Sequence, residues 1–352
     1  MTPARPDRPA ANDPAGSAPA RSVLVLGGTG FIGYHATLEF LRRGYDVTAV
    51  GLPGPSAGAP LPPAVRVVLA DVETMPDPEL GRLLSGQWGV VYAAGVDDRC
   101  LPRAPAWDFF YAGNVRPAAR FFRIARVAGA RRGVLLSSYF SHFARAWPEL
   151  DLADRHPYIR SRIAQEAAAL EASRPDLELV ILQLPYVLGA APGARPLWAP
   201  LVRYVRAMPV VLYTGGGTNM VAVRHVAEAV AGAVESGRPG GCYVVGERNV
   251  LWRDFLSDIS ALAGRRKRVV TLPRPLVSCA ARAVRLAHRL RGRESGLDPV
   301  EFMSLQTART FVDVAPSRRE LGYGTGGYDD ALRDTVRSSL GGREDVRGPA
   351  FP

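Results

Sequence analysis

The fold is decided by the stretch Val23-Leu24-Val25-Leu26-Gly27-Gly28-Thr29-Gly30-Phe31-Ile32-Gly33. An apolar run that predicts a buried strand ends in glycines at three-residue spacing, and a helical pattern follows. The first glycine permits a sharp turn, the second removes a Cβ that would block a pyrophosphate, and the third allows close helix–strand packing. A pyrophosphate there would bind the free N–H groups of the helix N-terminus. Because the glycines lie between a strand and a helix, they predict a dinucleotide-binding turn rather than a merely structural one.

Strand and helix patterns alternate from this turn to about residue 185. This order predicts an α/β fold with a Rossmann-type, doubly wound parallel sheet over residues 22–185. Residues 51–64 are rich in Gly and Pro and are expected to be a loop. Further strands are predicted at 45–50, 65–69, 89–93, 133–136 and 179–184, and helices at 31–43, 116–128 and 158–173.

The regularity weakens after Pro185, where residues 190–218 are rich in Pro and Gly. Two helices are still predicted at 223–235 and 251–263, with a strand at 242–245 between them. We therefore expect a smaller C-terminal α/β substrate domain over 186–340, with a segment near 220–246 returning to the Rossmann domain. Residues 1–21 and 341–352 lack apolar periodicity and are predicted to be disordered tails.

The chain has 352 residues, of which 47% are hydrophobic, so it is long enough for a large buried core. Its formal net charge is +11, and Lys267 is the only lysine among 44 basic residues. We interpret this as an arginine bias spread over the chain rather than as a binding patch. The only dense basic run is Arg265-Arg266-Lys267-Arg268, which has few aromatic neighbours, and this argues against a nucleic-acid partner.

The three cysteines, Cys100, Cys242 and Cys279, lie far apart and form no metal-ligand pair. A sparse, odd set suits a reducing compartment, so we expect a cytoplasmic protein without a metal. The N-terminal residues lack the apolar centre of a signal peptide, and no stretch reaches the length of a membrane span. Residues 275–291 form a basic amphipathic pattern, for which a packed surface helix is favoured over a membrane-bound one. A homodimer is left open.

Tyr158 and Arg162 are the residues best placed for proton chemistry. They lie four residues apart near the start of a predicted helix and so share one helix face. A cation beside a phenol stabilises the phenolate, which lets a tyrosine exchange a proton nearer neutral pH. Without the upstream glycine turn, an ordinary surface pair would be the better interpretation.

Together these patterns resemble the extended short-chain dehydrogenase/reductase family, also called the NAD-dependent epimerase/dehydratase family, from about Ser22 to Leu340. The resemblance implies hydride transfer between nicotinamide (NAD or NADP) and an oxygen-bearing carbon of a small-molecule substrate. Tyr158 would be the acid/base, and a neighbouring hydroxyl would bind the same oxygen. The implied cofactor-binding positions are Gly27, Thr29, Gly30, Phe31, Ile32, Gly33, Asp71, Val72, Ala93, Ala94, Gly95, Asn114, Tyr158, Arg162, Pro185 and Val187.

Two departures from the family pattern concern the catalytic positions. Arg162 occupies the place of the family's lysine; it keeps the positive charge but stays protonated and cannot pass a proton on. Tyr139 occupies the place of the usual active hydroxyl after Ser137-Ser138. Either the Tyr139 phenol replaces that hydroxyl or Ser138 takes over its role.

The second half resembles the sterol-dehydrogenase, dihydroflavonol-reductase and hopanoid-associated epimerase branch, through residues 214–227, 242–246 and 272–276. Thr218 and Asn219 stand where nucleotide-sugar epimerases usually carry an arginine for the diphosphate, which disfavours such a substrate. Residues that would line a pocket for an apolar or aromatic carbonyl compound are Tyr186, Trp198, Tyr213 and Asn219.

Three functions follow from the resemblance. The first is an NAD(P)-dependent reductase or dehydrogenase, the second a sugar epimerase or dehydratase with bound NAD, and the third a cofactor-binding protein that has lost redox chemistry. The second strand ends in Val50-Gly51-Leu52, without the acid that grips the NAD ribose or the arginine that favours NADP. We therefore expect weak discrimination between the two cofactors.

Overall fold

The computed structural model describes residues 21–54, 60–193 and 197–341. Apart from residues 21 and 341, the two predicted tails lie outside these ranges. Within them, every strand and helix predicted above is present, with ends no more than two residues from the expected ones. Residues 190–218, expected to be irregular, also hold a helix and a strand, α8 (Ala199–Ala207) and β8 (Val211–Tyr213).

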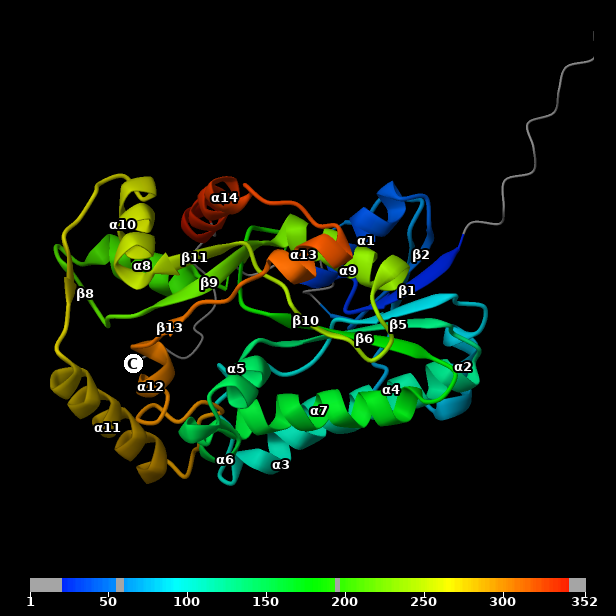
Figure 1. The fold of residues 1–352 in the computed structure, drawn as a ribbon, viewed down its shortest axis with the longest axis horizontal. Coiled ribbons are helices and arrows are strands. Elements are labelled where there is room, and N and C mark those ends of the chain that lie inside the picture. The colour runs from blue at the N-terminus through cyan, green and yellow to red at the C-terminus, as the bar shows by residue number, and fades with distance from the viewer. Residues whose placement is uncertain (1–20, 55–59, 194–196, 342–352) are drawn as a thin grey trace, which may run out of the picture.

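The centre of the molecule is a seven-stranded parallel sheet in the order β10-β6-β5-β4-β1-β2-β3 (Figure 1). This confirms the predicted doubly wound Rossmann-type fold. Its strands are short runs of Val, Leu and Ile because most are covered on both faces and need no polar side. They are β1 (Ser22–Leu26), β2 (Asp46–Gly51), β3 (Arg66–Leu69), β4 (Gly89–Tyr92), β5 (Arg132–Ser138), β6 (Glu178–Leu184) and β10 (Cys242–Val244).

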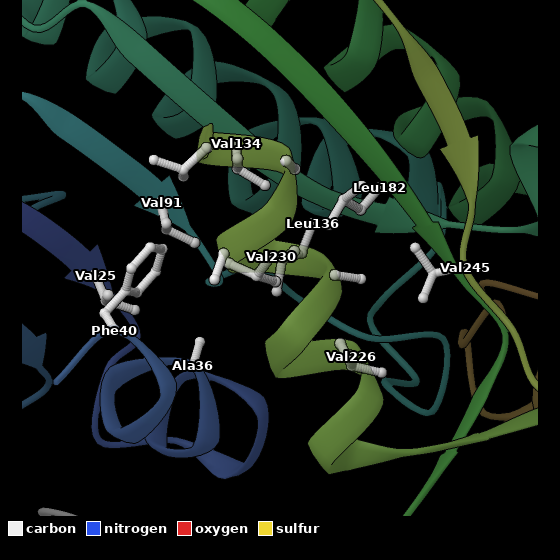
Figure 2. Close-up of a cluster of buried hydrophobic side chains, with 14 of the residues drawn as sticks. Val25, Ala36, Phe40, Val91, Val134, Leu136, Leu182, Val226, Val230 and Val245 are labelled. Atoms are coloured by element: carbon white, nitrogen blue, oxygen red, sulfur yellow. The ribbon is translucent and has the colours of Figure 1, made fainter. Parts of the chain in front are cut away.

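Helices cover both faces of this sheet. On one face, α1 (Phe31–Arg42) and α9 (Val223–Ser236) pack together, with α13 (Ala315–Leu321) beside α9. Figure 2 shows Phe40 of α1 beside Val25 and Val91 of the sheet, and Val230 of α9 beside Leu136. The other face is covered by α2 (Asp77–Leu84), α4 (Arg116–Val127) and α7 (Pro157–Ser173).

The second half of the chain contributes to both parts of the molecule. Strand β10 pairs with β6 at the edge of the large sheet, and α9 packs on α1, so residues 223–244 complete the Rossmann unit. The remaining strands form a small sheet around β9 (Gly217–Ala222), which pairs with β7 (Tyr186–Leu188), β11 (Arg248–Leu251) and β13 (Arg309–Thr310). Strand β8 pairs separately with β12 (Val269–Thr271).

The small sheet packs against α8, α10 (Trp252–Leu262) and α14 (Tyr328–Gly341) around a core of its own. The chain first passes from the large sheet to the small one at Pro185, because β6 ends one residue before it and β7 begins one residue after it. The shorter helices are α3 (Ala106–Phe110), a π-helix (Tyr111–Val115), α5 (Phe140–Ala146), a 3-10 turn (Pro148–Leu150), α6 (Leu152–Arg155), α11 (Arg274–Leu290) and α12 (Met303–Gln306).

Candidate active site

The candidate site lies at the carboxyl ends of the central strands. In a doubly wound sheet, ligands bind where the strand order reverses, which here is between β1 and β4. The residues that follow these strand ends are those singled out from the sequence. They include Gly27 after β1, Asp71 after β3, Ala93 after β4, Ser138 at the end of β5 and Pro185 after β6.

The glycine turn has the shape required for a diphosphate. Gly27 has a φ of +81°, which favours glycine, and its N–H donates to the Val50 carbonyl at 2.8 Å. A Cβ on Gly33 would lie 2.0 Å from the Gly27 oxygen, whereas one on Gly30 would meet only that oxygen, at 3.2 Å. Gly30 precedes α1 and provides no side-chain cap for the first-turn N–H groups, which have no partner within the helix. These features fit a dinucleotide cofactor.

Thr29, Phe31 and Ile32 surround this turn. Thr29 is buried, and a Cβ on Gly51 would lie 2.0 Å from its hydroxyl, so the Thr29 side chain lies directly over the end of β2. Phe31 and Ile32 are half-buried and pack against the core between the sheet and α1. The end of β2 thus presents a threonine hydroxyl where this fold usually places an acid or an arginine.

The ends of β3 and β4 form two further walls. The Asp71 carboxylate accepts the Glu73 N–H at 3.0 Å, and the Val72 carbonyl accepts a bond from Arg120 at 2.6 Å. Both residues are half-buried, so this turn is held in place beside the crevice. Ala93 continues the β4 ladder through its N–H to Leu26, followed by Ala94.

Gly95, Asn114 and Arg162 lie close together; Asn114 and Arg162 are buried, whereas Gly95 is exposed. A Cβ on Gly95 would lie 2.7 Å from the Asn114 side-chain oxygen and 3.4 Å from Arg162 Nη1. Asn114 lies in the π-helix and accepts the Val96 N–H at 2.8 Å, while its amide donates to Ser161 at 3.1 Å. The three residues therefore form a compact floor below the strand ends.

Arg162 is 7% exposed and is held by a single hydrogen bond within the described residues. Its Nη2 donates to the Leu136 carbonyl at 2.7 Å, and its buried Nε has no partner among those residues. The guanidinium carbon lies 5.9 Å from the centre of the Tyr158 ring. An unused buried donor beside the phenol fits a ligand hydroxyl at this position.

Burial raises the pKa of the Tyr158 phenol above its ordinary value, because the phenolate is poorly solvated there. Arg162 acts against this and lowers the pKa, and so does the neighbouring Ser138 hydroxyl. The expected effect of the cation is thus present, but desolvation outweighs it when no ligand is bound. Tyr158 is protonated at neutral pH in this state.

The two candidate hydroxyls after β5 face different ways. Ser138 interacts with the Tyr158 phenol, and its oxygen also accepts the Phe140 N–H at 3.3 Å. The Tyr139 hydroxyl instead bonds Thr218 of β9 at 2.8 Å, and burial raises its pKa to about 12. The structure therefore favours Ser138 over Tyr139 as the hydroxyl that assists Tyr158.

Asp98 is a titratable group of this site that the sequence reasoning missed. It follows the small-residue run after β4, is half-buried, and its charge raises the pKa values of Tyr139, Tyr158 and Tyr186. Burial raises its own pKa to about 6, and Arg162 lowers it slightly. The signal available in the sequence was a carboxylate pair, Asp97-Asp98, in the loop that follows β4.

Aromatic rings form a wall that extends from Tyr139 to the small sheet. The Tyr186 ring lies 6.0 Å from that of Tyr139, 5.4 Å from that of Trp198 and 5.5 Å from that of Trp252. Tyr213 extends the series, because its ring lies 5.8 Å from that of Trp252. Burial raises the pKa of the Tyr213 phenol to about 12, so these tyrosines are neutral.

Asn219 does not belong to this wall, contrary to expectation. It is 1% exposed, and its amide donates to Asn249 at 2.8 Å while its oxygen accepts the Glu247 N–H at 3.1 Å. Side chains alternate along β9, so Thr218, the residue before Asn219, is the one that reaches Tyr139.

Pro185 and Val187 are buried at the junction of the sheets, where the Val187 carbonyl accepts the Trp198 ring N–H at 3.0 Å.

Two curated proteins are similar to this chain in sequence. The chain is 25% identical over 331 residues to a Synechocystis sp. protein named "Putative dihydroflavonol 4-reductase", covering 89% of this chain and 93% of that protein. It is 26% identical over 217 residues to UDP-glucose 4-epimerase 2 of Arabidopsis thaliana, covering 54% of this chain and 61% of that enzyme.

Solved structures share the fold. The crystal structure of gox2253 superposes with a TM-score of 0.71 at 22% identity, over 90% of this chain and 97% of that one. The Bordetella bronchiseptica enzyme WbmF in complex with NADH gives a TM-score of 0.67 at 20% identity, over 91% and 92%. A model of the NAD-dependent epimerase/dehydratase family matches residues 23–246, well over half of the chain. The resemblance seen in the sequence is thereby confirmed, and the chain belongs to the NAD-dependent epimerase/dehydratase family of enzymes.

Proposed function

We propose that this enzyme is an NAD(P)-dependent reductase or dehydrogenase acting on a ketone or secondary alcohol of a small, apolar or natural-product-like substrate. The observation that carries the proposal is the meeting of Tyr158, Ser138 and Arg162 at the strand ends, between the glycine turn and an uncharged aromatic wall. This arrangement offers a proton donor, a second hydrogen bond and a fixed cation to one substrate oxygen and its cofactor.

The dinucleotide would be held by the glycine turn and the N-terminus of α1, with Arg162 Nε directed at a ribose hydroxyl. When bound, the nicotinamide supplies or accepts the hydride. For a ketone, the Tyr158 phenol donates its proton to the oxygen as the carbon is reduced, which leaves an alcohol and a phenolate. The Ser138 hydroxyl holds the same oxygen, and Arg162 stabilises the phenolate until a proton returns from solvent.

The substrate class is inferred from the second sheet. Thr218 and Asn219 occupy the positions from which nucleotide-sugar epimerases grip a diphosphate, and both are engaged with Tyr139 and Asn249 instead. Tyr186, Trp198 and Tyr213 are half-buried and pack in one aromatic cluster with Trp252, and such a cluster suits an apolar or aromatic body. A diphosphate needs charged partners, so a sugar epimerase with bound NAD is the second candidate.

Purified protein distinguishes the two candidates. We expect oxidation of added NADPH or NADH in the presence of aromatic or alicyclic ketones, and no stoichiometric nucleotide released on denaturation. Release of tightly held NAD on denaturation, with interconversion of a nucleotide sugar and no net cofactor turnover, would establish the epimerase instead.

Because Thr29 rather than an acid or arginine covers the end of β2, the affinities for NAD and NADP should differ by much less than a thousandfold in a binding titration.

A further inference from the structure

The net positive charge of this protein is concentrated in one segment of the chain. Residues 265–293 carry ten basic side chains and no acidic one, whereas the remainder has 34 basic and 33 acidic side chains. Arginine is preferred over lysine throughout the chain, but the excess of basic over acidic side chains is confined to this segment. This corrects the interpretation that the basic charge is spread over the whole chain. Ten of the eleven net charges lie on β12, α11 and their flanking turns.

Helix α11 is the main element of this segment and is attached to the protein by a narrow face. Only Ala281 is buried among its 17 residues. Arg274 donates to Thr307, and Arg285 lies 3.6 Å from Asp298 and Glu301, so these two arginines face the body of the protein. Figure 1 shows α11 at the periphery of the molecule, next to α12.

The opposite face of α11 is apolar and exposed. Leu276, Leu286 and Leu290 are 56%, 57% and 80% exposed. Exposed apolar residues scattered singly are ordinary, whereas a contiguous group marks an interaction surface. The spacing of the three leucines places them on one stripe of the helix surface, and exposed small residues lie between them. The stripe consists of Leu276, Cys279, Ala280, Ala283, Leu286 and Leu290.

Arginines border this stripe. Arg282 and Arg289 are seven residues apart on one of its edges, and Arg291 follows the helix; all three are exposed and form no ion pair among the described residues. An apolar stripe bordered by unpaired cations is the composition of helices that lie in the interface of an anionic bilayer. Within the described ranges, no helix is long and apolar enough to cross a membrane.

We propose that α11 docks this enzyme on the surface of an anionic phospholipid bilayer, with the leucine stripe in the headgroup–acyl boundary and the arginines on lipid phosphates. A second copy of the chain fits less well, because two segments with ten cations each would repel. The phosphates of a nucleic acid would pair with the arginines, but a nucleic acid would not bury the three exposed leucines. The proposal replaces the expectation of a simple packed surface helix for residues 275–291.

The docking face is connected to the candidate active site. The segment that follows α11 reaches Tyr158, whose N–H donates to the Gly296 carbonyl at 3.0 Å. A Cβ on Gly296 would lie 2.4 Å from the Phe110 ring and 3.0 Å from Tyr158 Cβ. The segment that carries Gly296 therefore links the end of α11 to the start of α7, where Tyr158 lies.

Vesicle co-sedimentation of the full chain tests the proposal. We expect binding to phosphatidylcholine vesicles that contain about one-third phosphatidylglycerol and none to phosphatidylcholine alone. Raising the salt from about 0.05 M to about 0.5 M should release most of the protein, because the Debye length shortens severalfold. Equal binding to both vesicle types, or none to either, would overturn the proposal.

Two variants and their matched controls complete the test. Leu276→Gln/Leu286→Gln/Leu290→Gln should bind at least about tenfold more weakly, and Arg282→Gln/Arg289→Gln about fivefold more weakly per arginine. The controls are Val67→Gln/Leu69→Gln/Val127→Gln, which changes exposed apolar residues elsewhere, and Arg333→Gln/Arg337→Gln, which removes the same charge from α14. Both controls should bind vesicles like the unmodified protein.

Other occupants of the stripe give different results. If the leucine variant converts a dimer to a monomer on size exclusion and leaves vesicle binding unchanged, α11 is an interface between copies. If duplex DNA competes fully with vesicles and the leucine variant binds it normally, the segment is a nucleic-acid site. Thermal unfolding and cofactor binding should be unaltered in all four variants, since the substituted side chains are exposed.

Discussion

The two halves of the candidate site are built from different parts of the polypeptide. The half that fits the cofactor consists of backbone: the turn at Gly27, the approach of Gly33 to it, and the uncapped start of α1. The half that faces the substrate oxygen consists of side chains from separate elements, namely Ser138 of β5, Tyr158 and Arg162 of α7, and Asp98 after β4. A backbone site tolerates almost no added atoms, whereas a side-chain site can be adjusted one group at a time.

The largest effect is expected from adding a side chain to the backbone half. In Gly33→Val the new Cβ would lie 2.0 Å from the Gly27 carbonyl oxygen, which is backbone and cannot move aside without opening the turn. We expect the free energy of unfolding to fall by about 4 kcal/mol or more, a large part of a typical domain's stability. Denaturant unfolding followed by circular dichroism measures this loss.

Gly30→Val is the matched control, because its Cβ would meet only the Gly27 oxygen, at 3.2 Å, and otherwise faces the space proposed for the diphosphate. Its stability should change by less than about 1 kcal/mol, while NAD(P) binding by calorimetry should be lost. Unchanged cofactor affinity in this variant would refute the assignment of the turn.

Tyr158→Phe tests the side-chain half and should have the next largest effect. Removing one hydroxyl keeps the ring, whose centre lies 5.8 Å from that of Phe110, so the fold is preserved. The rate should drop about 10²–10⁴-fold, the usual contribution of a general acid, with cofactor affinity little changed. Full activity in this variant would show that another group supplies the proton.

Arg162→Lys should have a smaller effect, because the charge that stabilises the phenolate remains. Lysine cannot reproduce the planar fork that holds the Leu136 carbonyl, but it can still reach a ribose hydroxyl. We expect kcat/KM to stay within about tenfold of the unmodified enzyme, and Arg162→Gln to lose more. A loss with lysine as large as that of Tyr158→Phe would mean that the guanidinium contacts the substrate itself.

The pH profile shows the smallest effect. Ketone reduction requires the protonated phenol, and burial raises the Tyr158 pKa, so kcat/KM for reduction should be flat near neutrality and fall only as the pH rises through that pKa. Asp98, when charged, also raises the Tyr158 pKa. Asp98→Asn should therefore move the alkaline fall to lower pH. Asp98→Glu is the control, because it keeps the negative charge. If the pH profile of Asp98→Asn matches that of the unmodified enzyme, Asp98 does not belong to the site.

The order of elements in the Rossmann half followed from the sequence because its signals are local. A strand buried on both faces is a run of Val, Leu and Ile, a helix that covers it is amphipathic, and the glycine turn between β1 and α1 has a fixed spacing. Tyr158 and Arg162 were found for the same reason, since one helical turn brings residues four apart together. The strands β7, β8 and β13 have two or three residues each and leave no periodic pattern to detect.

What only the tertiary structure decided concerns residues that meet from distant parts of the chain. The choice of Ser138 over Tyr139 depends on Thr218, 79 positions beyond Tyr139, which bonds the tyrosine hydroxyl. The exclusion of Asn219 depends on Asn249 and on side-chain alternation along β9. The outward direction of the leucines of α11 depends on which face of that helix the protein covers. The sequence by itself determined the sheet, the turn and the proximity of Tyr158 and Arg162; burial and long-range hydrogen bonds, which no local pattern contains, decided which neighbouring groups face them.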